Sequence, residues 1–238
     1  MTQPEQQPVA IVTGASHGFG RAVTAALLAR GWTVAGDARR ASELKSTVRT
    51  LNSRNFIALP GDVTDAAHRA ELVAAARTAG PLGLLVNNAS QLGPSPQPVL
   101  AEYSASELWM VYQTNLFAPL ALIQATLPAL ADNAGVIVNL TSDAAVEPYP
   151  GWGGYGSSKA ALDQISAVLA AEAPSVAVYA FDPGDMRTEM HQAAFPGEDI
   201  SDRAEPEAKV PALLRLLDTR PPAGRYRAVE LSLSGAPR

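Results

Sequence analysis

Three residues near the middle of the chain have side chains and spacings that suit carbonyl chemistry. Tyr155 and Lys159 are four positions apart in a segment whose alanine content predicts a helix, so their side chains would share one face. A nearby ammonium group favours phenolate, and we expect Lys159 to bring the pKa of Tyr155 toward neutrality. Such a tyrosine is usable as a general acid or base.

Ser142 lies thirteen residues before Tyr155, across a loop rich in glycine and proline. It ends a strand-like apolar run, which predicts that its hydroxyl points at the same substrate oxygen from another side. A tyrosine and a lysine at this spacing also describe an ordinary solvated helix face. The catalytic interpretation therefore depends on the elements that would position these residues.

The composition limits the classes of function. The chain has 238 residues, a formal net charge of −5 and no cysteine, which excludes disulfides, thiolate metal sites and a cysteine nucleophile. No basic run is longer than Arg39-Arg40, which argues against nucleic acid as a partner. The first residues lack an export signal, and polar residues and prolines interrupt the apolar tracts. We expect a cytoplasmic protein that acts on a small molecule, without a metal site or a membrane span.

The N-terminal part of the chain has the order that a dinucleotide site requires. A β-branched run at residues 9–12 predicts a strand buried on both faces, and the loop after it holds Gly14, Gly18 and Gly20. These glycines permit a tight turn, and a helix over residues 21–30 would aim its amino-terminal amides at a pyrophosphate. Strand, glycines and helix in this order predict binding rather than a glycine-rich turn without a ligand.

The rest of the chain continues this alternation. Strands are predicted at residues 32–37, 55–60 and 82–86, and an amphipathic helix at residues 66–78 would place His68 and Arg69 on its solvated face. We expect one α/β domain over residues 1–238, a doubly wound Rossmann-type parallel sheet with helices on both faces. Within it, residues 1–8 would form a flexible N-terminus and residues 189–210 a mobile lid over the cleft.

The choice of cofactor should be decided just after the second strand. A carboxylate there holds a ribose diol, whereas a cation holds a 2′-phosphate. Counting from the end of the preceding helix places Ala38 at the carboxylate position and Arg39 directly after it, which favours NADP(H). A shift of one residue would instead make Asp37 the ribose ligand of an NAD(H) enzyme. His17 in the glycine loop is either a further phosphate donor or merely exposed.

Two polar positions have open interpretations. Asp62 and Val63 follow the third strand, where they would contact an adenine edge or simply end the strand. Asn115 lies amid apolar residues in a long helix predicted over residues 104–130, and its amide must find partners or cost roughly 1–3 kcal/mol. It would either bond a kinked backbone near Pro119 or hold a water in a proton path.

Taken together, these residues resemble the short-chain dehydrogenase/reductase family over nearly the whole chain, from Val9 to about Ser234. The glycine loop, Asp62 and the strand end Asn87-Asn88-Ala89 match that family's motifs, as does the segment around Pro183 and Gly184. The expected cofactor site consists of Gly14, Ser16, His17, Gly18, Phe19, Gly20, Arg39, Asp62, Val63, Asn88, Ala89, Tyr155, Lys159, Pro183, Gly184 and Thr188.

The resemblance implies an oxidoreductase with a catalytic tetrad at Asn115, Ser142, Tyr155 and Lys159. Tyr155 would give a proton to the alkoxide that forms when nicotinamide delivers hydride to a carbonyl, and Ser142 would stabilise that oxygen. Lys159 would hold the ribose, and Asn115 would steady a water that resupplies the proton. The family also implies a homodimer or homotetramer built on the long helices.

Some positions depart from the family pattern. Ser90 replaces the last glycine of Asn-Asn-Ala-Gly, and Asp185 stands where the family is usually apolar. The C-terminal segment predicts a seventh strand but lacks the usual Asp-Gly-Gly ending. A substrate pocket and the core are alternative locations for the apolar side chains Leu92, Tyr149, Trp152, Met186 and Met190.

Two other functions fit parts of the sequence. Asp37 is compatible with an NAD-dependent alcohol dehydrogenase of the same fold. A non-catalytic dinucleotide-binding sensor would also keep the glycine loop, but the complete set of Ser142, Tyr155 and Lys159 argues against it.

Overall fold

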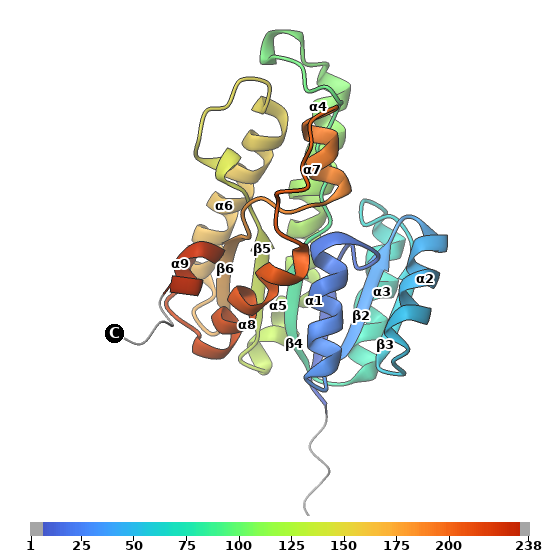
Figure 1. The fold of residues 1–238 in the computed structure, drawn as a ribbon. Coiled ribbons are helices and arrows are strands. Elements are labelled where there is room, and N and C mark those ends of the chain that lie inside the picture. The colour runs from blue at the N-terminus through green and yellow to red at the C-terminus, as the bar shows by residue number, and fades with distance from the viewer. Residues whose placement is uncertain (1–6, 234–238) are drawn as a thin grey trace, which may run out of the picture.

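The computed structural model describes residues 7–233, which form one seven-stranded parallel sheet between two layers of helices (Figure 1). The strand order is β3-β2-β1-β4-β5-β6-β7. The strands are β1 (Val9–Val12), β2 (Thr33–Ala38), β3 (Phe56–Pro60), β4 (Leu82–Asn87), β5 (Val136–Leu140), β6 (Ala177–Asp182) and β7 (Gly224–Arg227). The predicted doubly wound Rossmann-type sheet is confirmed.

The helices divide between the two faces of the sheet. One apolar core lies under α1 (Gly18–Ala29), α2 (Ala41–Leu51), α8 (Val210–Thr219) and α9 (Ala228–Leu233). The other lies under α3 (Ala66–Ala79), α5 (Ala118–Asp132) and α6 (Gly153–Glu172). Strand β1 shows why both layers are needed, because Ala10 and Val12 pack into the first core while Val9 and Ile11 pack into the second.

The predicted long helix over residues 104–130 is interrupted. It consists of α4 (Ala105–Tyr112), a π-helical turn at Gln113–Phe117 and α5, so Asn115 lies within the π turn. By length and composition alone, the stretch Ala105–Asp132 could cross a membrane, but half of its apolar window is buried inside the protein. Here α5 packs against β4 and α3 as part of a helical layer.

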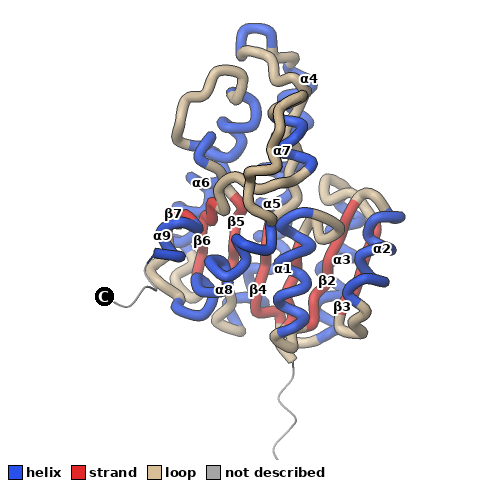
Figure 2. The backbone as a smooth tube through the Cα atoms, viewed as in Figure 1, coloured by secondary structure: helices blue, strands red, loops and turns tan. Residues whose placement is uncertain are grey.

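The segments that follow β4, β5 and β6 are long and rise above the carboxyl edge of the sheet (Figure 2). They carry α4, the start of α6 and the short helix α7 (Glu189–Ala194). Three short 3-10 turns, at Leu100–Glu102, Asp143–Ala145 and Pro206–Lys209, shape the same segments. In a doubly wound sheet the carboxyl edge beside the first strand is where ligands bind, so these segments border the expected site.

The structure describes the predicted C-terminal strand but only a small part of the predicted N-terminal segment. The predicted seventh strand is confirmed as β7, which pairs parallel to β6. Helix α9 follows it, which the sequence did not lead us to expect. Of the N-terminus predicted at residues 1–8, residues 1–6 lie outside the described residues.

We predict that Gly20→Ala destabilises the protein by about 1–3 kcal/mol, because overpacking at a close contact forces the backbone to shift. A Cβ at position 20 would overlap the carbonyl group of Gly14 and the side-chain amide of Asn88. Urea unfolding would measure the loss. Gly83→Ala is the control, since the nearest atoms to its Cβ are ring carbons of Trp32 at 3.5 Å. Equal stability of the two variants would contradict the prediction.

Candidate active site

A cleft of about 710 Å³ opens at the carboxyl edge of the sheet and collects most of the predicted cofactor residues. Of the predicted set, all but Gly20 and Gly184 line it. Gly20 instead packs beneath the loop against Gly14, and Gly184 lines a smaller adjoining pocket. Ala38, which the sequence placed at the position that decides the cofactor, also lines the cleft. The lining further includes residues that the sequence did not assign to the site, namely Arg40, Gly61, Ser90, Gln91, Thr114, Leu140, Thr141 and Glu189.

The glycine loop has the geometry that a pyrophosphate requires. Gly14 and Gly18 have φ values of 68° and 54°, in the left-handed region that favours glycine. Helix α1 begins at Gly18, earlier than predicted, and His17 at its N-cap makes no side-chain bond to its first amides. These amides remain available to an anion at the cleft, so the loop fits a dinucleotide.

Asp37 borders the cleft, but other residues of the protein already hold its carboxylate, so it is not a free ribose ligand. The residue is 1% exposed, and Oδ1 accepts a hydrogen bond of 2.8 Å from the backbone amide of Gly14. Its other oxygen, Oδ2, lies 3.1 Å from Nε2 of His68. The carboxylate therefore fixes the start of the glycine loop, and both of its oxygens are occupied.

The prediction that His68 lies on a solvated helix face is wrong. His68 is buried, and its ring fills the space beside Gly61. The hydrogen bond with Asp37 raises the pKa of His68, and the charge of Asp37 adds to this effect. The hydrophobic period of α3 does not indicate that His68 is buried, because its hydrogen-bond partner, Asp37, lies on a different element, β2.

Two arginines border the adenosine end of the cleft, and their environments differ. Arg40 lies 2.6 Å from Glu43 and 2.8 Å from Glu189 of α7, and it lowers the pKa of Glu189. Arg39 is exposed and has no ion pair among the described residues. His17 contacts the Ser16 hydroxyl at 2.8 Å and lies 3.5 Å from Glu43. Among these cations, Arg39 is therefore the one free to meet a phosphate.

Tyr155 and Lys159 lie together on α6 as predicted, and both are buried. The Lys159 ammonium lies 5.5 Å from the centre of the Tyr155 ring and donates a 2.7 Å hydrogen bond to the carbonyl of Leu140. The expected lowering of the tyrosine pKa is not what the surroundings of Tyr155 produce. Burial raises the pKa of Tyr155 to about 12, although the Ser90 hydroxyl opposes the rise. Burial also lowers the pKa of Lys159 to about 8.

Ser142 caps the 3-10 turn that follows β5. Its hydroxyl accepts from the amide of Ala144 at 3.2 Å and donates to the Asp143 carboxylate at 2.9 Å. Ser142 and Tyr155 line the same small pocket of about 120 Å³, which adjoins the main cleft. The serine and the tyrosine thus face a common space, as the sequence predicted.

Asn115 holds the loop after β4 rather than the backbone near Pro119. Its amide donates to the Gln91 carbonyl at 2.9 Å and accepts from the Gln91 backbone amide at 2.7 Å. It also donates to the Ser158 hydroxyl and accepts from the Ser90 hydroxyl. Asn115 is fully buried and does not line the cleft. A water held by this residue in a proton path stays a prediction.

Some of the apolar candidates line the small pocket and one does not. Leu92, Trp152, Met186 and Met190 line it, whereas Tyr149 is largely exposed and bonds to Asp143 instead. Asp185 also borders this pocket, 59% exposed, with Arg203 at 3.4 Å. Apolar and polar side chains therefore share the lining of this pocket.

Comparisons with known proteins agree with this geometry. The sequence model described as short chain dehydrogenase matches residues 8–199. The chain belongs to the short-chain dehydrogenase family. It is 37% identical over 201 residues to a sepiapterin reductase of Meriones unguiculatus, covering 78% of this chain and 77% of that protein. It is 34% identical to a serine 3-dehydrogenase of Agrobacterium fabrum, covering 76% and 72%.

Solved structures of short-chain dehydrogenases also superpose on this chain. One from Shigella flexneri, in complex with NADP, gives a TM-score of 0.86 at 28% identity and covers 94% of this chain and 100% of that one. Family membership makes this protein an oxidoreductase with a nicotinamide cofactor and a small-molecule substrate. The cleft and the glycine loop are the parts of this chain that would hold that cofactor.

The sequence did not indicate some of the charged contacts that shape this short-chain dehydrogenase site. The pair of Asp37 and His68 is one example, and a cluster around Arg225 and Asp182 is another. Their common feature is a charged residue inside or beside an apolar strand, as in β2 and β6. A charge in such a position requires a buried partner, so a charged residue in an apolar strand is the sequence signal that indicates such contacts.

We predict that the stabilisation provided by His68 depends on pH. The raised pKa means that folding favours the protonated imidazole, so its contribution is complete below the unfolded pKa near 6.5 and is lost as pH rises through the folded pKa. The free energy of unfolding of wild type minus that of His68→Gln should therefore shrink as pH rises above the unfolded pKa near 6.5 and through the raised pKa of the folded protein. Urea unfolding at several pH values measures it. His17→Gln, at an exposed histidine, is the control, and a pH-independent difference for His68→Gln would rule the charged pair out.

Proposed function

We propose that this protein is an NADP(H)-dependent oxidoreductase that transfers a hydride between nicotinamide and a small carbonyl or alcohol, with Tyr155 as the general acid or base. The observation that carries the proposal is that Tyr155 lines both the main cleft and the small pocket that holds Ser142. One cavity suits the cofactor and the other suits the substrate. Tyr155 stands where the two meet.

The adenosine end of the cleft supports NADP(H) over NAD(H). Asp37, the residue on which the NAD alternative rests, is buried and occupied by Gly14 and His68. Arg39 lines the cleft without a carboxylate partner in the described structure, so a 2′-phosphate would supply the missing anion. The Shigella flexneri relative solved with NADP is consistent with this choice.

In the direction of carbonyl reduction, Tyr155 would be the proton donor. When bound, reduced nicotinamide would supply the hydride. Because burial raises the pKa of Tyr155 to about 12, its phenol stays protonated at neutral pH and can donate to an alkoxide. Ser142 would hydrogen-bond to the same oxygen as charge develops on it. Lys159, buried beside the phenol, would hold the ribose and offset the negative charge that remains on Tyr155.

We also propose that the chain forms a homodimer or homotetramer. Large apolar side chains on α4 and at the turn into α5 are exposed, with Trp109 at 57%, Met110 at 50% and Phe117 at 40%. The rings of Trp109 and Phe117 lie 5.6 Å apart, so they form one patch. Exposed apolar patches of this kind mark interfaces. Sedimentation velocity would distinguish these assemblies from a monomer.

We predict that Tyr155→Phe lowers the rate of carbonyl reduction by about 10²–10⁴, because the proton donor is removed. Cofactor affinity should stay close to that of wild type. The rate is measured by NADPH consumption with 4-nitrobenzaldehyde, 2,3-butanedione and ethyl acetoacetate, and the affinity by calorimetry. Tyr112→Phe on α4, away from both cavities, is the control. A Tyr155→Phe enzyme with more than about a tenth of the wild-type rate would exclude this role.

We predict that wild type binds NADPH at least tenfold more tightly than NADH, a difference of about 1.4 kcal/mol. Arg39→Gln should remove most of that preference and leave NADH binding unchanged, because only the 2′-phosphate contact is lost. Calorimetric titration at fixed salt measures both. Arg49→Gln, at an exposed arginine on α2, controls for the general loss of positive charge. Tighter binding of NADH by wild type would favour the NAD alternative.

A further inference from the structure

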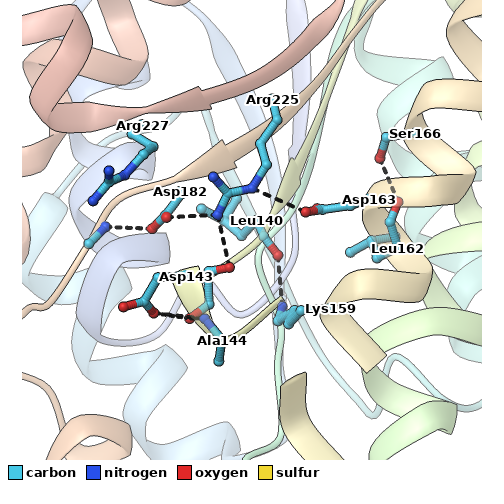
Figure 3. Close-up of polar contacts among 12 residues, drawn as sticks. Leu140, Asp143, Ala144, Lys159, Leu162, Asp163, Ser166, Asp182, Arg225 and Arg227 are labelled. Carbon is cyan, nitrogen blue, oxygen red and sulfur yellow. Dashed lines mark hydrogen bonds and ion pairs between the residues drawn. The ribbon is translucent and has the colours of Figure 1, made fainter. Parts of the chain in front are cut away.

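One arginine behind the catalytic residues joins three separate segments (Figure 3). Arg225 comes from β7, and its Nη2 donates to the backbone carbonyl of Ser142 at 3.0 Å and to Oδ2 of Asp182 at 3.0 Å. Its Nε donates to Oδ2 of Asp163 at 3.2 Å. The side chains are 26% exposed for Arg225, 17% for Asp163 and 4% for Asp182, so the cluster is largely shielded from water.

Each of these three contacts leads to a different part of the site. Ser142 is the proposed partner of the substrate oxygen, and its carbonyl is the atom that Arg225 holds. Asp182 ends β6, and its second oxygen accepts from the amide of Gly184 at 2.9 Å, which shapes the loop beside the cleft. Asp163 lies one helical turn after Lys159 on α6. The guanidinium therefore connects the serine segment, the loop after β6 and the tyrosine-bearing helix.

The cluster also balances charge near the reacting groups. The carboxylates of Asp182 and Asp143 raise the pKa of Tyr155, and the charge of Asp163 raises that of Lys159 against a larger lowering by burial. Burial raises the pKa of Asp163, while Arg225 and Lys159 lower it. One guanidinium thus pairs with a buried carboxylate, Asp182, and a partly buried one, Asp163. Its fork geometry, which lysine lacks, allows all three contacts at once.

We propose that Arg225 is a positioning residue for the reaction, because it holds the Ser142 segment and the loop after β6 in register with α6. It touches neither cavity itself. The expected effect of Arg225 on turnover rests on the catalytic roles proposed above for Ser142 and Tyr155. Its expected effect on the geometry of these segments is independent of those roles.

The test compares Arg225→Met and Arg225→Lys with matched changes at Arg227. Arg227 lies two residues further along β7, on the same side of the strand, and its side chain is exposed. With 4-nitrobenzaldehyde and NADPH, Arg225→Met should lower kcat about tenfold or more, since small displacements of reacting groups have effects of this size. The Kd for NADPH should change by less than about twofold, and Arg225→Lys should recover part of kcat. Arg227→Met and Arg227→Lys should behave as wild type.

Amide hydrogen exchange provides a readout that does not require turnover. In the Arg225 variants, peptides that cover residues 141–147 and 182–188 should exchange faster, while the glycine loop at residues 13–20 should not change. If Arg225→Met fails to fold, Arg225→Lys keeps one charge and carries the comparison. Unchanged kcat together with unchanged exchange would overturn the inference. So would a uniform loss of stability, cofactor affinity and kcat, which would assign Arg225 a merely structural role.

Failure of the proposed function gives a different pattern of results. If Tyr155→Phe keeps its activity, the assignment of the proton donor fails. The exchange measurement on Arg225→Lys still decides whether the guanidinium positions the Ser142 segment. Conversely, an inactive Tyr155→Phe with unaffected Arg225 variants would preserve the function and remove the positioning role.

Discussion

The interior of this site depends on one buried cation. Lys159 is 2% exposed, and within residues 7–233 the carbonyl of Leu140 is the one acceptor that hydrogen-bonds its ammonium group. An ammonium group in such a position is expensive to desolvate, and burial lowers its pKa to about 8. The end of β5 must therefore present its last carbonyl to α6. The same arrangement brings the phenol of Tyr155 beside the charge and away from water.

Other charges at the carboxyl edge of the sheet obey the same constraint. Asp37 at the end of β2 meets His68, and Asp182 at the end of β6 meets Arg225. Removing one member of such a pair leaves an uncompensated buried charge, which typically costs about 3–5 kcal/mol. Each pair also anchors a loop, through Gly14 in the first case and Gly184 in the second. At both places, the same group of contacts therefore compensates a buried charge and fixes the geometry of a loop.

Much of this structure was predictable because the relevant information is local. Alternating strands and helices, and the glycines at 14, 18 and 20, specified the sheet and the cleft, since periodicity and backbone freedom act over a few residues. The burial of His68 was not predictable from the period of its own helix. Its partner is 31 residues away and meets it only in the folded sheet. The pKa of Tyr155 is a similar case, because the neighbouring lysine is visible in the sequence but the burial that outweighs it is a property of the whole fold.

The π turn at Gln113–Phe117 changes how the two helices around it face the protein. A π turn holds one more residue than an α turn, and each α-helical residue rotates the side-chain direction by about 100°. The apolar stripes of α4 and α5 are therefore out of phase with each other. Leu122 of α5 is fully buried, whereas Trp109 of α4 is 57% exposed. The extra residue therefore shifts the faces that α5 presents relative to α4 by about the rotation of one α-helical residue.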